Sequence, residues 1–418
     1  MNFKATSDTP LTEEQIKQVV HQAFEHYSVD NEKVLVIIPD TTRTAPMPTL
    51  FRTLHERLGK TVEKFDILVA LGTHPPLSDA HLESHLGIQL SDFPDVGFYN
   101  HHWDSPEHLY SAGTLPESKV SELSGGMLQE TVNVTLNKLV RDYDKLIIIG
   151  PVFPHEVVGM SGGSKYLFPG ISGPDFLNLF HWLGALITSS ALIGKADTPV
   201  RRVINEAAKL VKVDQFTLNL VMDGRDMKGL YIGDSTDAWN EAAEQSRKMN
   251  TMFKPHPFDR VLSCAPEMYD DLWTGAKCMY KLEPVVADGG ELIIYAPHIT
   301  EISKTHGKLI EQIGYHVRDY FTKQSNRFKN IPGGIRAHST HVKGLGTFEN
   351  GIETPRIQVS LATGIPKEIC EQVNLGYVDP LSIDVDNWGR DDERALIVPH
   401  AGEKLYRLEN DPFGLDSQ

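Results

Sequence analysis

Three apolar segments of the chain, each with the pattern of a buried β-strand, are followed at once by side chains that bind anions or move protons. Asp40 and Arg43 follow the first segment, His74 the second and His155 the third, and Lys165 lies in the glycine-rich stretch just beyond. In α/β proteins, ligands bind beyond the carboxyl ends of such strands. If the three strands are neighbours, a carboxylate, a guanidinium, two imidazoles and an amine share one cleft. This convergence is the strongest functional signal in the sequence.

The glycine-rich stretch 159–165 (GMSGGSK) has the outline of a phosphate-binding P-loop but departs from it twice. Ser164 precedes the lysine where the motif has glycine, and Tyr166 stands where a Ser or Thr would hold magnesium. These departures argue against a kinase. What remains is a loop whose backbone N–H groups, including those of Gly162 and Gly163, could cradle an anion.

Other histidines need separate interpretation. His181 lies in an apolar helix between Phe180 and Trp182, and a buried imidazole must find a hydrogen-bond partner or a metal. No HxH, HxxxH or HExxH pattern accompanies it, so the spacing does not indicate zinc and both explanations stay open. The adjacent pair His101 and His102 is interpreted as structural, because neighbouring residues on a strand point to opposite faces.

Apolar runs alternate with helical patterns along the chain. KVLVIIPD, FDILVALGTH and DKLIIIGPVFPH are continuous apolar runs, typical of strands buried on both faces of a parallel sheet. A helix after Thr12 is indicated by a capping-box pattern with Gln15. The alternation predicts an α/β fold with mainly parallel sheets.

We expect two α/β domains with an active-site cleft between them. Residues 1–255 are expected to form the N-terminal domain, to which residues 375–418 return. Residues 256–374 are expected to form a smaller C-terminal domain that closes over the cleft. The hydrophilic stretch 241–257 is the candidate hinge.

Composition limits the possible partners. The 418 residues include 40 Lys and Arg against 56 Asp and Glu, a net charge of −16, and such a surface repels nucleic-acid phosphates. The 3 cysteines lack CxxC spacing, which fits a reducing compartment. The N-terminus shows no apolar leader, and no apolar run approaches the roughly 18 residues of a membrane span. We therefore expect a cytoplasmic protein that binds neither nucleic acid nor membranes.

Taken together, the segments DTTR, GTH, PHEVVGMSGGSKYLFPG and LFHWLGAL resemble the lactate racemase family. The resemblance runs from about Val34 to the end of the chain. Its most distinctive part is the spacing of His155, Lys165 and His181 around the glycine-rich loop.

The resemblance implies a nickel pincer cofactor, a pyridinium-3,5-bisthiocarboxylic acid mononucleotide whose ring carbon and two sulfurs hold the nickel. It implies that Lys165 tethers this cofactor and that His181 is a further nickel ligand. Other cofactor-binding residues implied by the resemblance are Asp40, Arg43, Gly162 and Gly163. Enzymes that make the cofactor are then implied as maturation partners.

The resemblance also implies the reaction, which is racemisation or epimerisation at C2 of a 2-hydroxy acid by proton-coupled hydride transfer to and from the cofactor. His74 and His155 match the acid–base pair, and two histidines suit a reaction at two faces. Arg43, Lys277 and Trp273 match substrate-binding positions.

One departure from the lactate-acting members concerns the substrate. They carry a Tyr-Gln pair before the second-domain lysine, whereas this chain has Trp273 and Thr274. The aromatic ring is retained and the amide is lost, so we expect a substrate other than lactate, such as malate, an aromatic hydroxy acid or a sugar acid.

Two other functions remain open from the sequence. One is a hydrolase or lyase that uses a histidine-bound metal without the pincer. The other is a non-catalytic two-domain protein that binds an anion, although such a protein needs Arg43 and Lys277 but has no need of two acid–base histidines.

Overall fold

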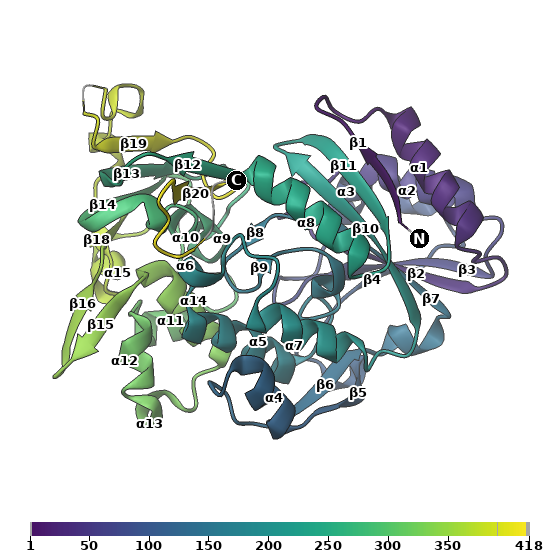
Figure 1. The fold of residues 1–418 in the computed structure, drawn as a ribbon, viewed down its shortest axis with the longest axis horizontal. Coiled ribbons are helices and arrows are strands. Elements are labelled where there is room, and N and C mark those ends of the chain that lie inside the picture. The colour runs from purple at the N-terminus through teal and green to yellow at the C-terminus, as the bar shows by residue number, and fades with distance from the viewer. Residues whose placement is uncertain (1, 391, 415–418) are drawn as a thin grey trace. The chain divides into compact units, whose positions relative to one another are not determined.

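Figure 1 shows the fold in a computed structural model, which describes residues 2–390 and 392–414. Contacts between residues divide the chain into two compact units. Unit 1 runs to Phe153 and includes Met160–Leu177 and Pro199–Met249. Unit 2 consists of Pro154–Gly159, Asn178–Thr198 and the chain from Asn250 onward. The expected domain boundary at residue 255 stays a prediction.

Unit 1 is built on a seven-stranded sheet in the order β1-β11-β10-β7-β2-β3-β4. The strands are β1 (Phe3–Thr6), β2 (Lys33–Pro39), β3 (Lys64–Ala70), β4 (Phe98–Asn100), β7 (Lys145–Pro151), β10 (Asp214–Asp223) and β11 (Asp226–Gly233). β11 runs antiparallel to its two neighbours, β1 and β10, and the other neighbouring strands of this sheet are parallel to one another. The three strands singled out from the sequence, β7, β2 and β3, lie side by side and parallel, so their carboxyl ends meet at one edge.

Helices cover this sheet and bury its apolar residues. They are α1 (Glu13–His26), α2 (Met47–Leu58), α3 (Asp79–Leu86), α4 (Glu117–Ser124), the start of α5 (Pro174–Ile187), α7 (Pro199–Ala208) and α8 (Asp237–Asn250). The predicted capping box of α1 is confirmed, because Thr12 Oγ1 accepts a hydrogen bond from Gln15 N and Gln15 Oε1 accepts one from Thr12 N. Side chains of α1 and α2 share a core with alternate residues of β2, such as Val34 and Val36.

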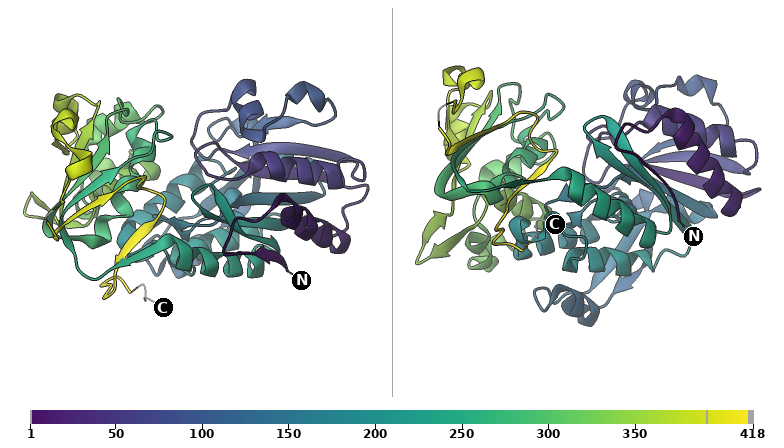
Figure 2. Two further views of the ribbon diagram at one scale, coloured as in Figure 1. Left: turned by 90° about the horizontal axis from the view of Figure 1, so that it is seen from above. Right: turned by 45° about the horizontal axis from the view of Figure 1, so that its top comes forward.

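Unit 2 contains a five-stranded, wholly parallel sheet in the order β18-β17-β14-β13-β19. Figure 2 shows these strands in green to yellow. They are β13 (Phe258–Cys264), β14 (Val286–Ala296), β17 (Gln358–Thr363), β18 (Gly376–Tyr377) and β19 (Ala395–Val398). β12 (Thr251–Lys254) pairs with β20 (Leu405–Leu408), so all three strands of the segment 375–418, β18, β19 and β20, pair within unit 2.

The helices of unit 2 that matter for function are α9 (Leu272–Gly275), α10 (Lys277–Tyr280), α12 (Arg318–Thr322), α14 (Gly333–Lys343) and the later residues of α5. They pack on one large apolar core with the sheet. Both units therefore have the α/β architecture with mainly parallel sheets that the sequence predicts.

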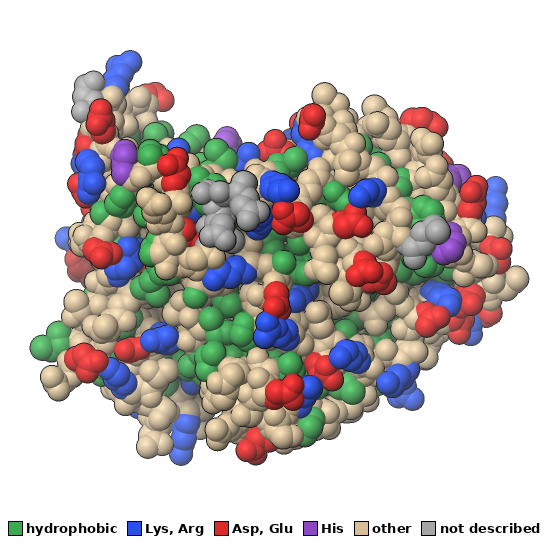
Figure 3. All heavy atoms as spheres, in the orientation of Figure 1, with side chains coloured by type: hydrophobic (Ala, Val, Ile, Leu, Met, Phe, Trp, Pro, Cys, Tyr) green, Lys and Arg blue, Asp and Glu red, His purple; other side chains and the backbone are tan. Residues whose placement is uncertain are grey.

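The surface carries charges of both signs. On the face drawn in Figure 3, acidic and basic side chains are interspersed, and no continuous basic patch is visible on that face. Among the described residues, no helix combines the length and the apolarity that crossing a membrane requires.

Candidate active site

The carboxyl ends of β2 and β3 bring Asp40 and His74 into direct contact. The Asp40 carboxylate pairs through Oδ2 with Nδ1 of His74. Its Oδ1 accepts hydrogen bonds from Thr42 N at 3.1 Å and Thr42 Oγ1 at 2.7 Å. An ionised carboxylate can only accept, so Nδ1 of His74 must carry the proton. In the neutral ring Nε2 is then the basic nitrogen, which is the state a general base needs.

Asp40 is buried, yet its surroundings keep it ionised. Burial raises the pKa of this carboxyl, but the charge and hydrogen bond of His74, the charge of Arg43 and the hydrogen bond of Thr42 together hold the pKa well below its usual value of 3.8. The side chain of His74 is 27% exposed against 7% for Asp40. The imidazole is thus accessible to a ligand, and the carboxylate behind it is not.

This arrangement gives a pH dependence of stability. A carboxyl whose pKa is lowered by folding contributes stability above its unfolded pKa, and that contribution is lost as the pH falls. We expect the difference in free energy of unfolding between wild type and Asp40→Asn to be constant above about pH 5 and to shift against the wild type below about pH 4. Urea unfolding of both proteins from pH 3 to pH 7 measures it. A difference that does not change with pH would contradict the lowered pKa.

Arg43 and the glycine-rich loop lie at the same edge of the sheet. The Arg43 guanidinium is 5.3 Å from the centre of the Phe153 ring. Tyr166, on the loop, is buried and feels the charges of both Arg43 and Asp40. Its ring packs on Gly150 of β7, where a Cβ would lie only 1.9 Å from Cε2 of the tyrosine. The loop is therefore fixed against the strand ends by a ring that needs a glycine beneath it.

The glycine-rich loop is held from the inside by Arg201 and Trp239. The Arg201 guanidinium donates to the carbonyl oxygens of Met160 and, at 3.2 Å, of Gly162. The indole N–H of Trp239 donates to the carbonyl oxygen of Ser161 at 2.6 Å, and Arg201 stacks over the indole at 4.0 Å. Carbonyl oxygens of the loop therefore face inward, where buried donors satisfy them.

Lys165 stands out from its neighbours in this loop. It lies on the short 3-10 helix Gly163–Tyr166, in which it is partly exposed while Gly163, Ser164 and Tyr166 are buried. Gly162 and Gly163 have φ values of 81° and 58°, and a Cβ on Gly162 would lie 2.5 Å from Val152. The glycines allow the loop to pack closely around a lysine that stays partly exposed.

Arg201 is a residue that sequence reasoning undervalued, because nothing in the pair Arg201–Arg202 shows which arginine is buried. Replacing Arg201 by Met would remove the hydrogen bonds of the guanidinium to the Met160 and Gly162 carbonyl oxygens, of which Gly162 O keeps its bond from Lys165 N at 3.3 Å. We expect Arg201→Met to lower the free energy of unfolding by about 1–3 kcal/mol, the usual cost of one buried acceptor left unsatisfied. The exposed Arg202→Met is the matched control and should change it by about 0.5 kcal/mol or less. Equal changes in the free energy of unfolding of the two variants, measured by urea denaturation, would show that Arg201 does not stabilise the loop.

In unit 2, His155 is buried beside a second carboxylate. Its Nδ1 accepts a hydrogen bond from Val157 N at 3.2 Å and lies 3.2 Å from Glu156 Oε2. The first contact requires an Nδ1 without a proton and the second an Nδ1 that carries one, so Nδ1 has a partner in either state. The ring packs against Phe180 of α5, with centroids 6.5 Å apart.

His181 and Trp273 both lie near a buried histidine, His338, that the sequence analysis did not single out. Trp273 stacks on His338 with centroids 4.1 Å apart and also contacts His306 at 4.7 Å. Burial, followed by the charges of His341, His306 and His181, lowers the pKa of His338 well below its usual value. Only the tertiary structure shows that these rings meet.

Lys277, the remaining predicted residue, begins α10 one turn after Trp273. It is buried, with its amine 4.5 Å from the centre of the Tyr269 ring. A cation over an aromatic face is attracted to the ring. His101 is structural as expected, because Nε2 bonds the Ser172 carbonyl oxygen and Nδ1 accepts from Asn137. Within the described part of the chain, no group of three or more His, Cys, Asp or Glu could hold a metal by itself.

The structure therefore assembles the predicted residues in two sets. In unit 1, Asp40, Arg43 and His74 meet beside the loop that carries Lys165. In unit 2, His181 and Trp273 lie close to His338. The catalytic, metal-binding and cofactor-binding roles of these residues stay predictions.

Both sets belong to an α/β chain with known relatives. The family model "Lactate racemase N-terminal domain" matches residues 2–194. The lactate racemase of Thermoanaerobacterium thermosaccharolyticum is 26% identical over 282 residues, covering 66% of this chain and 61% of the relative. The lactate racemase of Lactiplantibacillus plantarum is 23% identical over 279 residues, covering 65% and 62%. This chain thus spans less than two thirds of the length of these relatives.

Solved structures resemble the chain over nearly its whole length. A crystal structure of a Thermotoga maritima protein is 35% identical, with a TM-score of 0.90, covering 97% of this chain and 100% of that one. The lactate racemase apoprotein of Thermoanaerobacterium thermosaccharolyticum gives a TM-score of 0.71 at 21% identity, covering 96% and 94%. The chain is therefore similar to lactate racemases over about two thirds of its length, and its residues 2–194 match the N-terminal domain of that family.

Proposed function

We propose that this protein is a racemase or epimerase that inverts C2 of a 2-hydroxy acid with a nickel pincer cofactor tethered at Lys165. The observation that carries the proposal is the Asp40–His74 pair, which presents an oriented base beside Arg43 and the glycine-rich loop. Similarity to lactate racemases supports the reaction type.

The residues present fit such a cofactor. Lys165 is the partly exposed residue of an otherwise buried loop, and Gly162 and Gly163 let that loop pack closely against Val152 and Trp239. A pincer brings three of its own donors, so one imidazole suffices from the protein, and His181 is the candidate. When bound, the cofactor would supply the hydride acceptor that C2 inversion requires.

The chain's own residues would handle protons and position the substrate. Nε2 of His74 would take the proton of the substrate hydroxyl and return it, with Asp40 holding the ring in the required tautomer. His155 would do the same at the opposite face. Arg43 would bind the substrate carboxylate in a charge-assisted pair, with Lys277 as a second cation.

The substrate is proposed to differ from lactate. Trp273 stacks on His338, and His306 lies against the same indole. A substrate side chain there would meet aromatic faces and ring nitrogens rather than the small apolar contact that a methyl group prefers. A longer or more polar 2-hydroxy acid suits these surroundings better.

The test uses protein produced together with enzymes that make the pincer cofactor. We expect a mass increment on the peptide that carries Lys165, about one nickel per chain, and inversion of a 2-hydroxy acid with deuterium retained at C2. Chiral chromatography of single 2-hydroxy acids reads the inversion. Unmodified Lys165 together with activity restored by zinc or manganese would favour a histidine-metal hydrolase or lyase. Tight binding without C2 inversion would favour the anion-binding protein.

A further inference from the structure

A cavity of about 120 Å³ in unit 2 lies one helical turn from the histidines described above. Its wall includes Ala185, four residues after His181 on α5, and His341, three residues after His338 on α14. Residues at these spacings lie on the same face of a helix. A water needs about 10–15 Å³ by this measure, so the cavity can hold a small organic molecule.

Two buried polar atoms at this cavity have no hydrogen-bond partner in the described structure. They are Nε2 of His341 and Oγ of Ser189, on side chains that are 5% exposed each. An unpaired buried polar atom costs about 1–3 kcal/mol. Such atoms around one cavity indicate a polar occupant.

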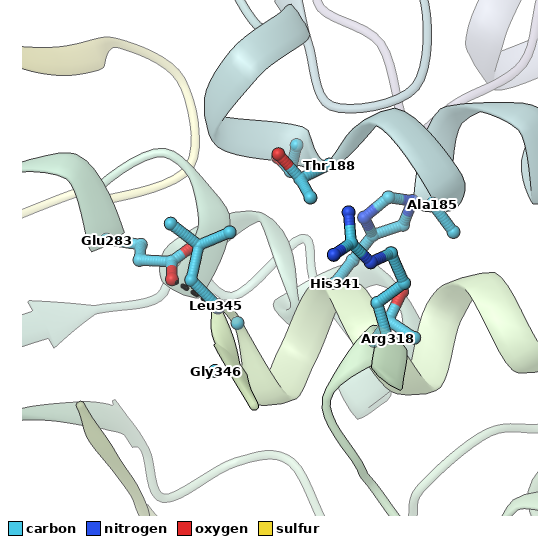
Figure 4. A pocket seen from close by; sticks show the side chains of 10 residues that line it. Ala185, Thr188, Glu283, Arg318, His341, Leu345 and Gly346 are labelled. Carbon is cyan, nitrogen blue, oxygen red and sulfur yellow. Dashed lines mark hydrogen bonds between the residues drawn. The ribbon is translucent and has the colours of Figure 1, made fainter. Parts of the chain in front are cut away.

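Arg318 supplies the cavity with a guanidinium cation, two of whose N–H groups are not used in its hydrogen bonds to other described residues. Its guanidinium donates to Leu186 O at 3.1 Å and, through Nε and one terminal nitrogen, to Asp319 Oδ1 at 3.2 and 3.0 Å. These bonds use three of the five N–H groups of an arginine. Figure 4 shows Arg318, His341 and Thr188 turned toward one another in the cavity.

The acidic groups nearby are already paired. Glu283 lies on the other side of the view in Figure 4, where it accepts from Ser190 Oγ at 3.1 Å and Leu345 N at 2.7 Å and is 3.9 Å from the Arg356 guanidinium. Asp319 is also 3.5 Å from the Lys323 amine. Both carboxylates therefore already have hydrogen-bond or ion-pair partners other than the two remaining N–H groups of Arg318.

The backbone at the cavity has an unfavourable conformation. Thr188, between α5 and α6 (Ser189–Leu192), has a φ of 94°. A β-branched residue rarely adopts such an angle, and strain of this kind is retained mainly where the surroundings require it. The angle fixes the turn that presents Thr188 and Ser189 to the cavity.

We propose that this cavity binds a carboxylate group, held by the guanidinium of Arg318 and by hydrogen bonds from Ser189 and His341. Arginine forms planar, two-point pairs with carboxylates, which suits its two remaining donors. The carboxylate would come from a free small acid or from the distal end of a longer ligand whose other end reaches His181. The proposal does not depend on racemase activity, because binding to the apoprotein tests it.

The experiment titrates the full-length apoprotein with acetate and with succinate at constant ionic strength, and follows ligand NMR signals. We expect Arg318→Gln to weaken the binding of both acids by about tenfold or more. Arg327→Gln, an arginine of the same unit that contacts Tyr320, is the matched control and should bind like wild type. Ser189→Ala, which removes only a hydroxyl, should weaken binding severalfold. This second variant keeps the test decisive if the arginine variant does not fold.

The two acids distinguish the sources of the carboxylate. Acetate binding at least as tightly as succinate indicates a small free anion, and tighter binding of succinate indicates the distal end of a longer ligand. The proposal is overturned if neither acid binds, or if Arg318→Gln and Ser189→Ala both bind as wild type does. Near-identical circular dichroism spectra would show that the variants are folded.

Discussion

Protein in which Lys165 is replaced by arginine is expected to show no mass increment and only background turnover, even when produced with the cofactor-making enzymes. In the proposed reaction the cofactor would carry the hydride step, so its loss would remove the chemistry rather than slow it. Arginine keeps the positive charge and much of the length, but its guanidinium does not form the covalent bond that a lysine amine forms. The substitution therefore removes the covalent tether while it keeps the positive charge, so the two contributions can be told apart.

The position of Lys165 makes this experiment clean. The residue is partly exposed between buried neighbours, so the substitution should leave the packing of the loop on Trp239 intact. Lys209→Arg is the control, because Lys209 is an exposed lysine paired with Glu206 at 2.8 Å. Intact-protein mass, nickel content and C2 inversion are measured on both variants. Wild-type turnover in Lys165→Arg would reject the tether at this residue.

The part of the candidate site that follows the strands of unit 1 was predictable from the sequence. Asp40, His74 and the glycine-rich loop each follow an apolar run, and the runs form adjacent parallel strands. Strand order is not written in the sequence, but residues at the carboxyl ends of buried strands meet wherever the strands are neighbours. The hydrogen bond between Asp40 and His74 then follows from their position.

The rest of the site depends on contacts between distant segments. His338 meets Trp273, 65 positions earlier in the sequence, and Arg201 reaches the carbonyl oxygen of Met160, 41 positions away. Neither residue belongs to a motif, and each has an equally plausible surface role when read alone. Burial and partner identity decided their roles, and both come only from the tertiary structure.

The Asp40–His74 pair gives the second large prediction. Replacing His74 by alanine should lower kcat by about 10²–10⁴-fold, the usual contribution of a positioned acid–base group. Binding of the 2-hydroxy acid should be nearly unchanged, because Arg43 is expected to hold the carboxylate. The measurement is C2 inversion in nickel-loaded protein, with substrate affinity determined separately by calorimetry.

Asp40→Asn tests the proposed role of Asp40, which is to hold His74 in the tautomer of a base. An amide can donate to Nδ1 and so favour the tautomer in which Nε2 carries the proton, which cannot take a proton from the substrate. We expect kcat to fall by about 10²–10⁴-fold with little change in affinity. Because the two residues act as one unit, the double variant should be little worse than His74→Ala alone. Losses that instead multiply in the double variant would mean that Asp40 acts through another group, such as Arg43, whose charge it also feels.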